Sequence, residues 1–305
     1  MLAESEHTTM TKNNDIKAII ETVNKKVIAD IEAGNTNWIK SWTSNNHKSV
    51  EGYEYTGFNQ LWLHCLNFKK PIFGTYIQWN KKGCKIKKGS KAVKLLRAQE
   101  GVKKTEKDGV EKTEYFKFFR SFPVFNIDQV EGNLEQFENL TNTENKVIDK
   151  TKIENFVNGT GAVIRHGYSG AFYRPSEDFI GMPDKASFID TNVKSATENY
   201  YSVLLHELTH WTGSKNRLNR IKGSLFGSPE YAFEELIAEL GSAYACNYLG
   251  LNNTPRSDHA HYLKNWLSAI KNNPNALIKA SGYASKSLNY LVQLQSNQPG
   301  IKQVA

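Results

Sequence analysis

The chain has 305 residues, of which 39% are hydrophobic, 11% aromatic and 23% charged. This length suits about two domains, and the aromatic content excludes a disordered chain. No segment approaches ~18 consecutive apolar residues, and the polar N-terminus lacks the apolar core of a secretory signal, so we expect a cytoplasmic protein with no membrane segment. The three cysteines form no C-x-x-C pair, which predicts reduced thiols.

The net charge of +8 is concentrated in one segment. Between Lys69 and Arg97 the chain has ten Lys or Arg residues and no Asp or Glu. Such a run is typical of a surface that binds a polyanion, although a solvated lysine-rich face is the alternative. Aromatic residues are interleaved here and further on, and rings beside cations suit the unstacked bases of single-stranded nucleic acid. These rings are Phe68, Phe73, Tyr76, Trp79, Tyr115, Phe116, Phe118 and Phe119.

The N-terminal half is predicted to contain three helices after a flexible tail at residues 1–14. An apolar stripe predicts an amphipathic helix over 15–34 with Asp15 as its cap, and a second helix is expected over 57–68. Thr75 and Gln78 have the spacing of a capping box, which predicts a short helix that runs to about Lys82 and ends at Gly83.

Two strands and a linker are expected next. The strands are predicted at 92–96 and 116–125, the second broken near Pro123, with a charged loop or hairpin tip over 100–114 between them. Residues 131–150 are acidic, rich in Asn and short of large apolar residues. We therefore predict a first domain at 15–130, a linker at 131–150 and a second domain at 151–305.

The second domain is predicted to be mostly helical with a small sheet, which makes the fold class α+β. A strand is expected at Ala171–Arg174. The predicted helices cover residues 198–211, 229–249, 259–271 and 274–294, the last with Asn273 as cap and Pro274 at its first position.

The motif His206-Glu207-Leu208-Thr209-His210 is the most specific signal in the chain. On a helix, residues i and i+4 share one face, so both imidazoles reach one metal ion, and Glu207 is placed to act on a metal-bound water as catalytic acid/base. A structural helix with two stacked histidines is the alternative. The chemistry predicts one Zn²⁺ per chain, with another divalent metal as the alternative.

Catalytic zinc needs a third protein ligand, and the next predicted helix offers three glutamates. Glu235 is the predicted ligand, with Glu234 as the second choice because it points about 100° away on the helix. Glu239 lies one turn after Glu235 and is predicted to accept a hydrogen bond from a ligand histidine.

These motifs resemble those of the ArdC-type antirestriction proteins of conjugative plasmids and mobile elements. In the C-terminal half the similar segments are His206–Gly213, Arg217–Arg220, Tyr231–Leu240 and Asp178–Pro183. In the N-terminal half they are Gly57–Asn59, Thr75–Trp79, Gly83, Lys88–Gly89 and Val124–Gln129. The resemblance covers about residues 15–295.

The resemblance implies an N-terminal single-stranded-DNA-binding domain, a C-terminal zincin-like metallopeptidase domain and protection of incoming DNA from host restriction. It also implies His206, His210 and Glu235 as metal ligands and Glu207 as the catalytic residue. Charge and stacking, rather than the resemblance, select the predicted DNA contacts, which are Tyr76, Trp79, Lys81, Lys82, Lys85, Lys87 and Lys88.

The sequence leaves three function classes to compare. The first is a shield that coats single-stranded DNA, with a metal site that is structural or serves another task. The second is an active zinc metalloprotease that cleaves a host or element protein, with DNA binding for targeting. A nuclease is disfavoured, because nucleases prefer carboxylate-rich Mg²⁺ sites or paired metals. The oligomeric state and any protein substrate are not specified by the sequence.

Overall fold

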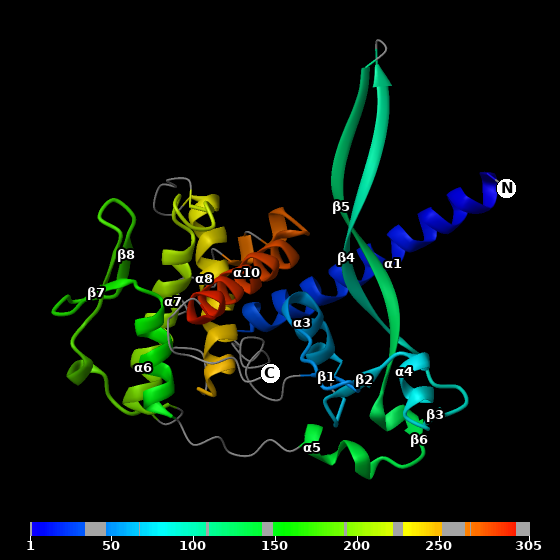
Figure 1. Cartoon of the computed structure of the whole chain (residues 1–305), viewed down its shortest axis with the longest axis horizontal. Coiled ribbons are helices and arrows are strands. Elements are labelled where there is room, and N and C mark those ends of the chain that lie inside the picture. The colour runs from blue at the N-terminus through cyan, green and yellow to red at the C-terminus, as the bar shows by residue number, and fades with distance from the viewer. Residues whose placement is uncertain are drawn as a thin grey trace. The chain divides into compact units, whose positions relative to one another are not determined.

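The computed structural model describes residues 2–33, 47–66, 68–107, 110–141, 149–191, 194–221, 228–251, 266–268 and 270–296. Helices predominate in this part of the chain and the strands form small sheets, so the α+β fold class is confirmed (Figure 1). None of the described helices combines the length and hydropathy needed to cross a bilayer.

The chain divides into two compact units. The first consists of Met1–Lys25, His47–Tyr55 and Trp62–Asn142, and the second takes the rest, including the C-terminal half. The division after Asn142 falls inside the predicted 131–150 linker. The N-terminal division is more interleaved than predicted, because helix α1 (Leu2–Glu32) and helix α3 (Gly57–Cys65) each contribute to both units.

The first unit is built on a sheet with the strand order β1-β2-β5-β4. Strand β1 (Lys48–Ser49) is parallel to β2 (Ile72–Gly74), which is antiparallel to β5 (Val110–Asn126). A second ladder joins β3 (Lys85–Ile86) to β6 (Val130–Glu131). Between and after these strands lie helix α4 (Tyr76–Lys81), the 3-10 helices η1 (Ile127–Gln129) and η2 (Glu135–Phe137), and helix α5 (Glu138–Thr141).

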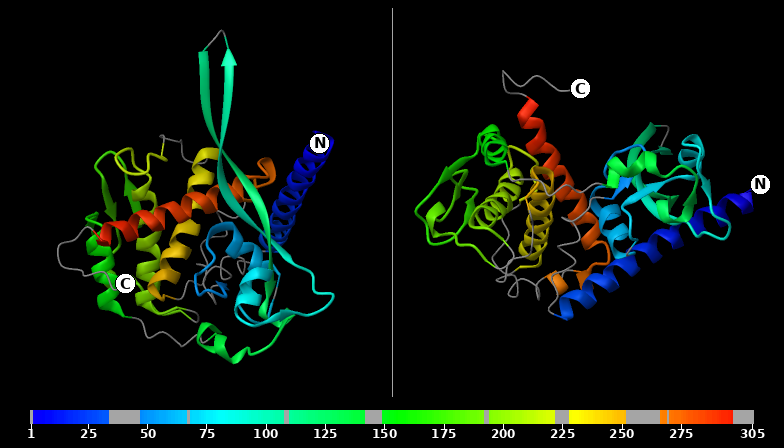
Figure 2. Two further views of the ribbon diagram at one scale, coloured as in Figure 1. Left: turned by 45° about the vertical axis from the view of Figure 1, so that its right-hand side comes forward. Right: turned by 90° about the horizontal axis from the view of Figure 1, so that it is seen from below.

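Strand β4 (Val93–Lys107) and strand β5 form one long antiparallel ribbon, which extends away from the other strands of its unit (Figures 1 and 2). Of the two alternatives predicted for residues 100–114, the charged loop is wrong, since both strands continue into this segment. The hairpin is confirmed, because β4 and β5 pair antiparallel as far as Lys107 and Val110. Pro123 does not break β5 either. It pairs with Lys94 on one side, and pairing with β2 begins only at Phe125, so the other side of Pro123 needs no amide donor.

Helix α1 also differs from its prediction, because it begins at Leu2 rather than after a flexible tail of residues 1–14. No Pro or Gly interrupts residues 2–14, so the helix continues toward the N-terminus. Asp15 consequently lies inside the helix, where its carboxylate pairs with the Lys94 ammonium at 2.6 Å instead of capping a helix end.

Helix α4 has the predicted capping box between Thr75 and Gln78. This geometry turns Trp79 into the core, where it is 0% exposed, donates its Nε1–H to the carbonyl of Phe125 at 3.0 Å and packs edge-on against Phe137. A buried ring with a satisfied donor cannot stack on a base. The prediction that Trp79 contacts DNA is therefore wrong.

The second unit packs helices around a separate core. Helix α6 (Lys150–Gly159), α7 (Ala196–Thr212), α8 (Pro229–Leu249) and α10 (Ala276–Ser296) surround buried side chains that include Leu204, Leu208 and Leu249. The predicted helix over 259–271 falls mostly outside the described residues. A sheet of order β7-β9-β8 completes the unit, with β7 at Val163–Arg165, β8 at Phe172–Arg174, β9 at Phe179–Gly181, and the short 3-10 helix η3 at Lys185–Ser187.

A substitution in α4 separates a core role from a surface role. Trp79→Ala removes a buried ring and is expected to lower the free energy of unfolding by about 3–5 kcal/mol. Tyr76→Ala on the same helix removes a ring that is 58% exposed and is expected to change it by less than about 0.5 kcal/mol. Thermal denaturation of both variants checks this, and a fully stable Trp79→Ala variant would contradict it.

Candidate metal centre

Helix α7 presents the two histidines on the side that faces helix α8. Its start is fixed by a capping box in which Ser195 accepts from the amide of Glu198 and the Glu198 carboxylate accepts from the amide of Ser195. The approach of α8 is close at Gly241, where an added Cβ would lie 2.4 Å from the Thr209 side chain. The Ser242 hydroxyl also donates to the Ser202 carbonyl at 2.8 Å, so the two helices are held in one register.

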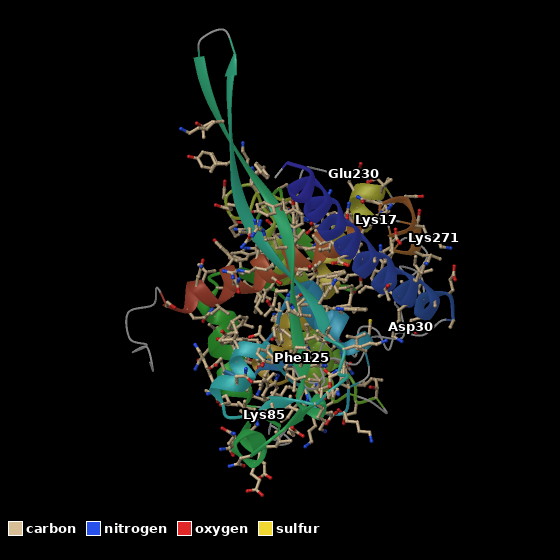
Figure 3. The ribbon with its side chains drawn as sticks, turned by 90° about the vertical axis from the view of Figure 1, so that its right-hand side faces the viewer. Lys17, Asp30, Lys85, Phe125, Glu230 and Lys271 are labelled. Carbon is tan, nitrogen blue, oxygen red and sulfur yellow. The ribbon has the colours of Figure 1, made fainter. Side chains whose placement is uncertain are left out.

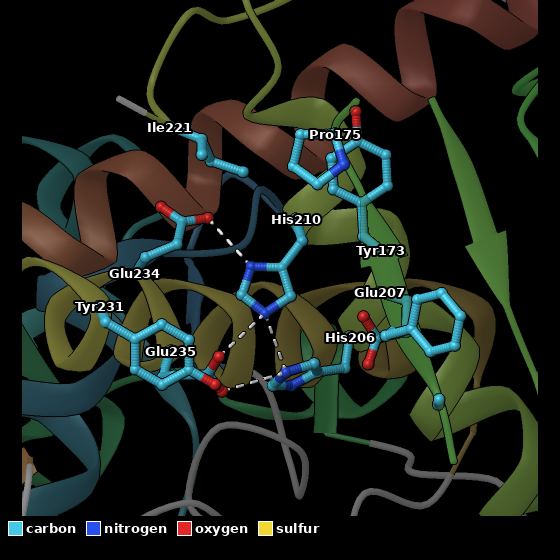
Figure 4. Close-up of a pocket in the computed structure, with 11 residues that line it drawn as sticks. Tyr173, Pro175, His206, Glu207, His210, Ile221, Tyr231, Glu234 and Glu235 are labelled. Carbon is cyan, nitrogen blue, oxygen red and sulfur yellow. Dashed lines mark hydrogen bonds and ion pairs between the residues drawn. The ribbon is translucent and has the colours of Figure 1, made fainter. Parts of the chain in front are cut away.

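Three donor side chains converge between these helices (Figure 4). The Nε2 atoms of His206 and His210 are 3.2 Å apart, and each lies 3.5 Å from one carboxylate oxygen of Glu235. Ligands 2.0–2.1 Å from a tetrahedral ion are roughly 3.3 Å from one another. The donor types and spacing therefore fit one divalent metal ion.

The other imidazole nitrogens are held by two further glutamates. The Nδ1 atom of His206 lies 3.2 Å from Glu239, and the Nδ1 atom of His210 lies 3.1 Å from Glu234. Such carboxylates fix the ring orientation and leave both Nε2 atoms facing the donor cluster. Glu239 thus has the geometry predicted for it, whereas Glu234, the second choice as ligand, faces the far nitrogen of His210.

Arg220 holds Glu234 in place, and its part in the site was not foreseen from the sequence. Its Nε and one terminal nitrogen each donate to Glu234 at 2.7 Å. The same guanidinium donates to the Thr209 carbonyl at 2.8 Å and to Ser287 of α10 at 3.0 Å. One arginine therefore connects α7, α8 and α10 around the histidines. In the sequence, Arg220 stood out only as part of the Arg217–Arg220 segment that resembles the family.

The charges of the cluster suit a cation. Burial alone would lower the pKa of His210, but the carboxylates of Glu234 and Glu235 raise it to about 9. Burial would also lower the pKa of His206, but Glu239 and Glu235 raise this pKa well above its usual value. Burial would raise the pKa of Glu235, yet hydrogen bonds from both histidines hold it far below its ordinary range. A metal ion bound at this cluster would therefore have to displace protons from the imidazoles.

Glu207 opens onto the same pocket, a cavity of about 320 Å³. Its carboxylate is buried, and within the described part of the chain it makes no ion pair or hydrogen bond. This distinguishes it from Glu234, Glu235 and Glu239, which all contact a histidine. Glu207 is thus the carboxylate of the pocket that remains available to a bound water.

Strand β8 forms one wall of the pocket, and Arg217 connects this strand to the end of α7. Tyr173 lines the cavity, and its hydroxyl donates to Asp178 at 2.8 Å and accepts from Arg217 at 2.9 Å. The Arg217 guanidinium also lies 3.9 Å from the centre of the Trp211 ring. These contacts fix the position of β8 beside the histidines.

The predicted DNA contacts lie in the other unit. Tyr76, Lys81, Lys85, Lys87 and Lys88 are exposed, and Lys82 is partly exposed and lies 3.6 Å from Glu51. The Lys87 ammonium donates to the Asp128 carbonyl at 2.9 Å. Figure 3 shows Lys85 at the surface of its unit. The structure thus keeps this set accessible except for Trp79.

Comparison with known proteins matches both halves of the chain. A family model described as the N-terminal domain of anti-restriction factor ArdC matches residues 17–125, and a zincin-like metallopeptidase model matches residues 151–283. The antirestriction ArdC protein of plasmid R388, solved metal-free, is 32% identical over 92% of this chain and 98% of that one, with a TM-score of 0.71. The chain belongs to the ArdC family.

Other relatives extend the ArdC family match. The R388 ArdC protein was also solved with Mn(II) bound, and that structure is 30% identical with the same TM-score of 0.71. An uncharacterized protein y4eC of Sinorhizobium fredii is 33% identical over 92% of this chain and 93% of its own length. DNA primase TraC of Escherichia coli is 32% identical over 92% of this chain, which spans only 28% of that primase.

The donor geometry predicts which side chains control metal binding. His206→Ala and His210→Ala each remove one nitrogen of the cluster, so each variant is expected to lose stoichiometric metal after purification. Glu230→Ala, an exposed glutamate at the start of α8 (Figure 3), should keep it. Elemental analysis of the purified chains is the measurement. Full metal content in both histidine variants would show that the ion binds elsewhere.

Proposed function

We propose that this chain is an antirestriction protein of a plasmid or mobile element, which binds single-stranded DNA in the cytoplasm and protects incoming DNA from host restriction. The observation that carries the proposal is the basic segment 69–97, which lies in the unit matched by the ArdC N-terminal model and keeps its lysines exposed, apart from the partly exposed Lys82. The R388 relative supports the link to plasmids.

The proposal includes a metal site in the second unit. We assign His206, His210 and Glu235 as ligands, with Glu234 and Glu239 orienting the two imidazoles. Zinc is the proposed ion because two imidazoles and one carboxylate leave the fourth position of a tetrahedral ion open to water. Manganese is the alternative, supported by the Mn(II)-bound relative.

A second candidate function, peptide hydrolysis, is favoured by the position of Glu207. A bound divalent metal would supply a Lewis acid for a carbonyl oxygen and lower the pKa of water. The free carboxylate of Glu207 would take a proton from the attacking water and deliver it to the leaving amine nitrogen. The peptidase would act on a host or element protein, with DNA binding for targeting.

We favour DNA coating as the protective activity. A basic surface with exposed rings accounts directly for holding a strand, whereas neither the sequence nor the pocket specifies a protein to be cleaved. On this view the metal site serves a separate proteolytic task or stabilises the second unit.

Binding by the full chain should prefer single-stranded to duplex DNA, with little sequence preference. Affinity should fall with salt, at a slope of about −0.7 per neutralised phosphate. Reversing the charges of Lys85, Lys87 and Lys88 should weaken binding, whereas reversing Lys150, Lys152 and Lys279 in the second unit makes the same charge change and should not. Fluorescence anisotropy at several salt concentrations measures this. A flat salt response or equal affinity for duplex would contradict the proposal.

Glu207→Gln separates the two functions. The change removes the proton acceptor without removing a metal ligand, so metal content and DNA affinity should be unchanged. If coating protects DNA, the variant should protect as well as wild type. Any peptidase activity should fall on the order of 10²–10⁴-fold. The measurement is survival of restriction-sensitive DNA entering a cell that carries each variant, and loss of protection by Glu207→Gln would favour the enzyme instead.

A further inference from the structure

The β4–β5 ribbon carries large apolar side chains that are exposed to solvent. Tyr115, Phe116 and Phe119 are 77%, 47% and 41% exposed, and Val102 is 55% exposed. All four lie on the part of the ribbon that extends beyond β2, whose pairing with β5 covers only Phe125 and Asn126. Exposed apolar residues favour an interaction site where they are contiguous on one face, so their distribution over the ribbon matters.

The alternation of the strands sorts these residues onto two faces. One face consists of the cross-strand pairs Arg97–Arg120, Gln99–Phe118 and Gly101–Phe116, and we call it the arginine face. The opposite face consists of Ala98–Phe119, Glu100–Lys117 and Val102–Tyr115. Both faces thus carry aromatic rings, but only the first carries two arginines.

The rings of the arginine face pack against the ribbon and against each other. Phe116 lies across Gly101, where an added Cβ would be 2.6 Å from the ring, so the missing side chain lets the ring lie against the ribbon. The Phe116 and Phe118 rings are 5.7 Å apart and inclined by 37°, and the Arg120 guanidinium is 5.5 Å from the Phe118 ring centre. The face is a row of two rings and two cations.

The charges of residues 93–99 and 115–123 are positive, and on the arginine face they have no carboxylate partner among the described residues. Residues 93–99 and 115–123 contain Lys94, Arg97, Lys117 and Arg120 but no Asp or Glu. Within the described residues, neither Arg97 nor Arg120 pairs with a carboxylate. On the opposite face, Lys94 pairs with Asp15 at 2.6 Å and Lys117 stands across from Glu100. The uncompensated positive charge therefore lies beside the Phe116 and Phe118 rings.

We propose that the arginine face is a stacking platform for single-stranded DNA, with bases on Phe116 and Phe118 and phosphates on Arg97 and Arg120. This inference rests on the proposed function of the chain and locates a contact that the basic segment alone does not supply. Exposed rings stack on unpaired bases whatever their sequence, whereas the base faces of a duplex are already stacked on one another. Guanidinium groups beside the rings match the phosphates of the same strand.

The test uses the full chain and a fluorescent oligothymidylate of about 20 nucleotides. Phe116→Ala/Phe118→Ala should weaken binding by at least about tenfold, since each stacked base contributes about fivefold or more and two are lost. Tyr115→Ala/Phe119→Ala removes two rings of the opposite face and is the matched control, expected to change affinity less than about threefold. Arg97→Ala/Arg120→Ala should reduce the salt slope by about 1.4, or 0.7 for each phosphate that is no longer neutralised.

Gly101→Val tests the ordering of the rings, because it keeps every ring and cation but forces Phe116 off the ribbon. It should weaken binding of the oligothymidylate without changing the salt slope. Unchanged affinity in Phe116→Ala/Phe118→Ala, with wild type binding normally, would overturn the inference. So would a change of oligomeric state in that variant at unchanged DNA affinity, which would identify the face as a contact between copies. If wild type itself does not bind the oligonucleotide, the proposed function fails instead.

Discussion

The close packing of helix α8 on helix α7 is the contact on which the candidate site depends. Neither helix by itself holds a complete donor set, because α7 supplies two imidazoles and α8 supplies the carboxylates. Gly241 removes the side chain that would keep the helices apart at Thr209, the residue just before His210. The resulting spacing brings Glu235 within 3.5 Å of both Nε2 atoms.

Burial of so many ionisable groups would be costly unless each had a partner. Glu234 meets both His210 and Arg220, and Glu239 meets His206. Removing one member of such a buried ionic network typically costs about 3–5 kcal/mol, so Arg220 contributes to stability as well as to the orientation of His210. Glu207 differs because no described side chain forms an ion pair or hydrogen bond with it. A buried carboxylate without an ion-pair or hydrogen-bond partner is better suited to proton transfer than to structural support.

The first unit separates its aromatic residues by burial rather than by position in the sequence. Trp79 and Phe73 are buried in two separate core clusters, whereas Tyr76, Tyr115 and Phe116 remain exposed. Tyr115 and Phe116 lie on the part of the ribbon beyond β2, where, among the described residues, β4 and β5 pair only with each other. Rings that looked equivalent in the sequence therefore divide into a core set and a surface set.

The sequence predicted those features that depend on interactions between residues close together in the chain. The spacing of His206 and His210, the capping box at Thr75 and the helix from Pro229 to Leu249 follow from contacts within a few residues, and the structure has each of them. The extent of the strands, the burial of single rings and the contacts of Arg220 depend on residues that are distant in the sequence. The charged residues over 100–114 predicted either a loop or a hairpin tip, and only the pairing of β4 with β5 selects the hairpin and sets its length. Trp79 was predicted to lie at the surface, but its contacts with Phe125 and Phe137 place it in the core. Arg220 joins three helices through contacts up to 67 residues away, and no local pattern contains that information.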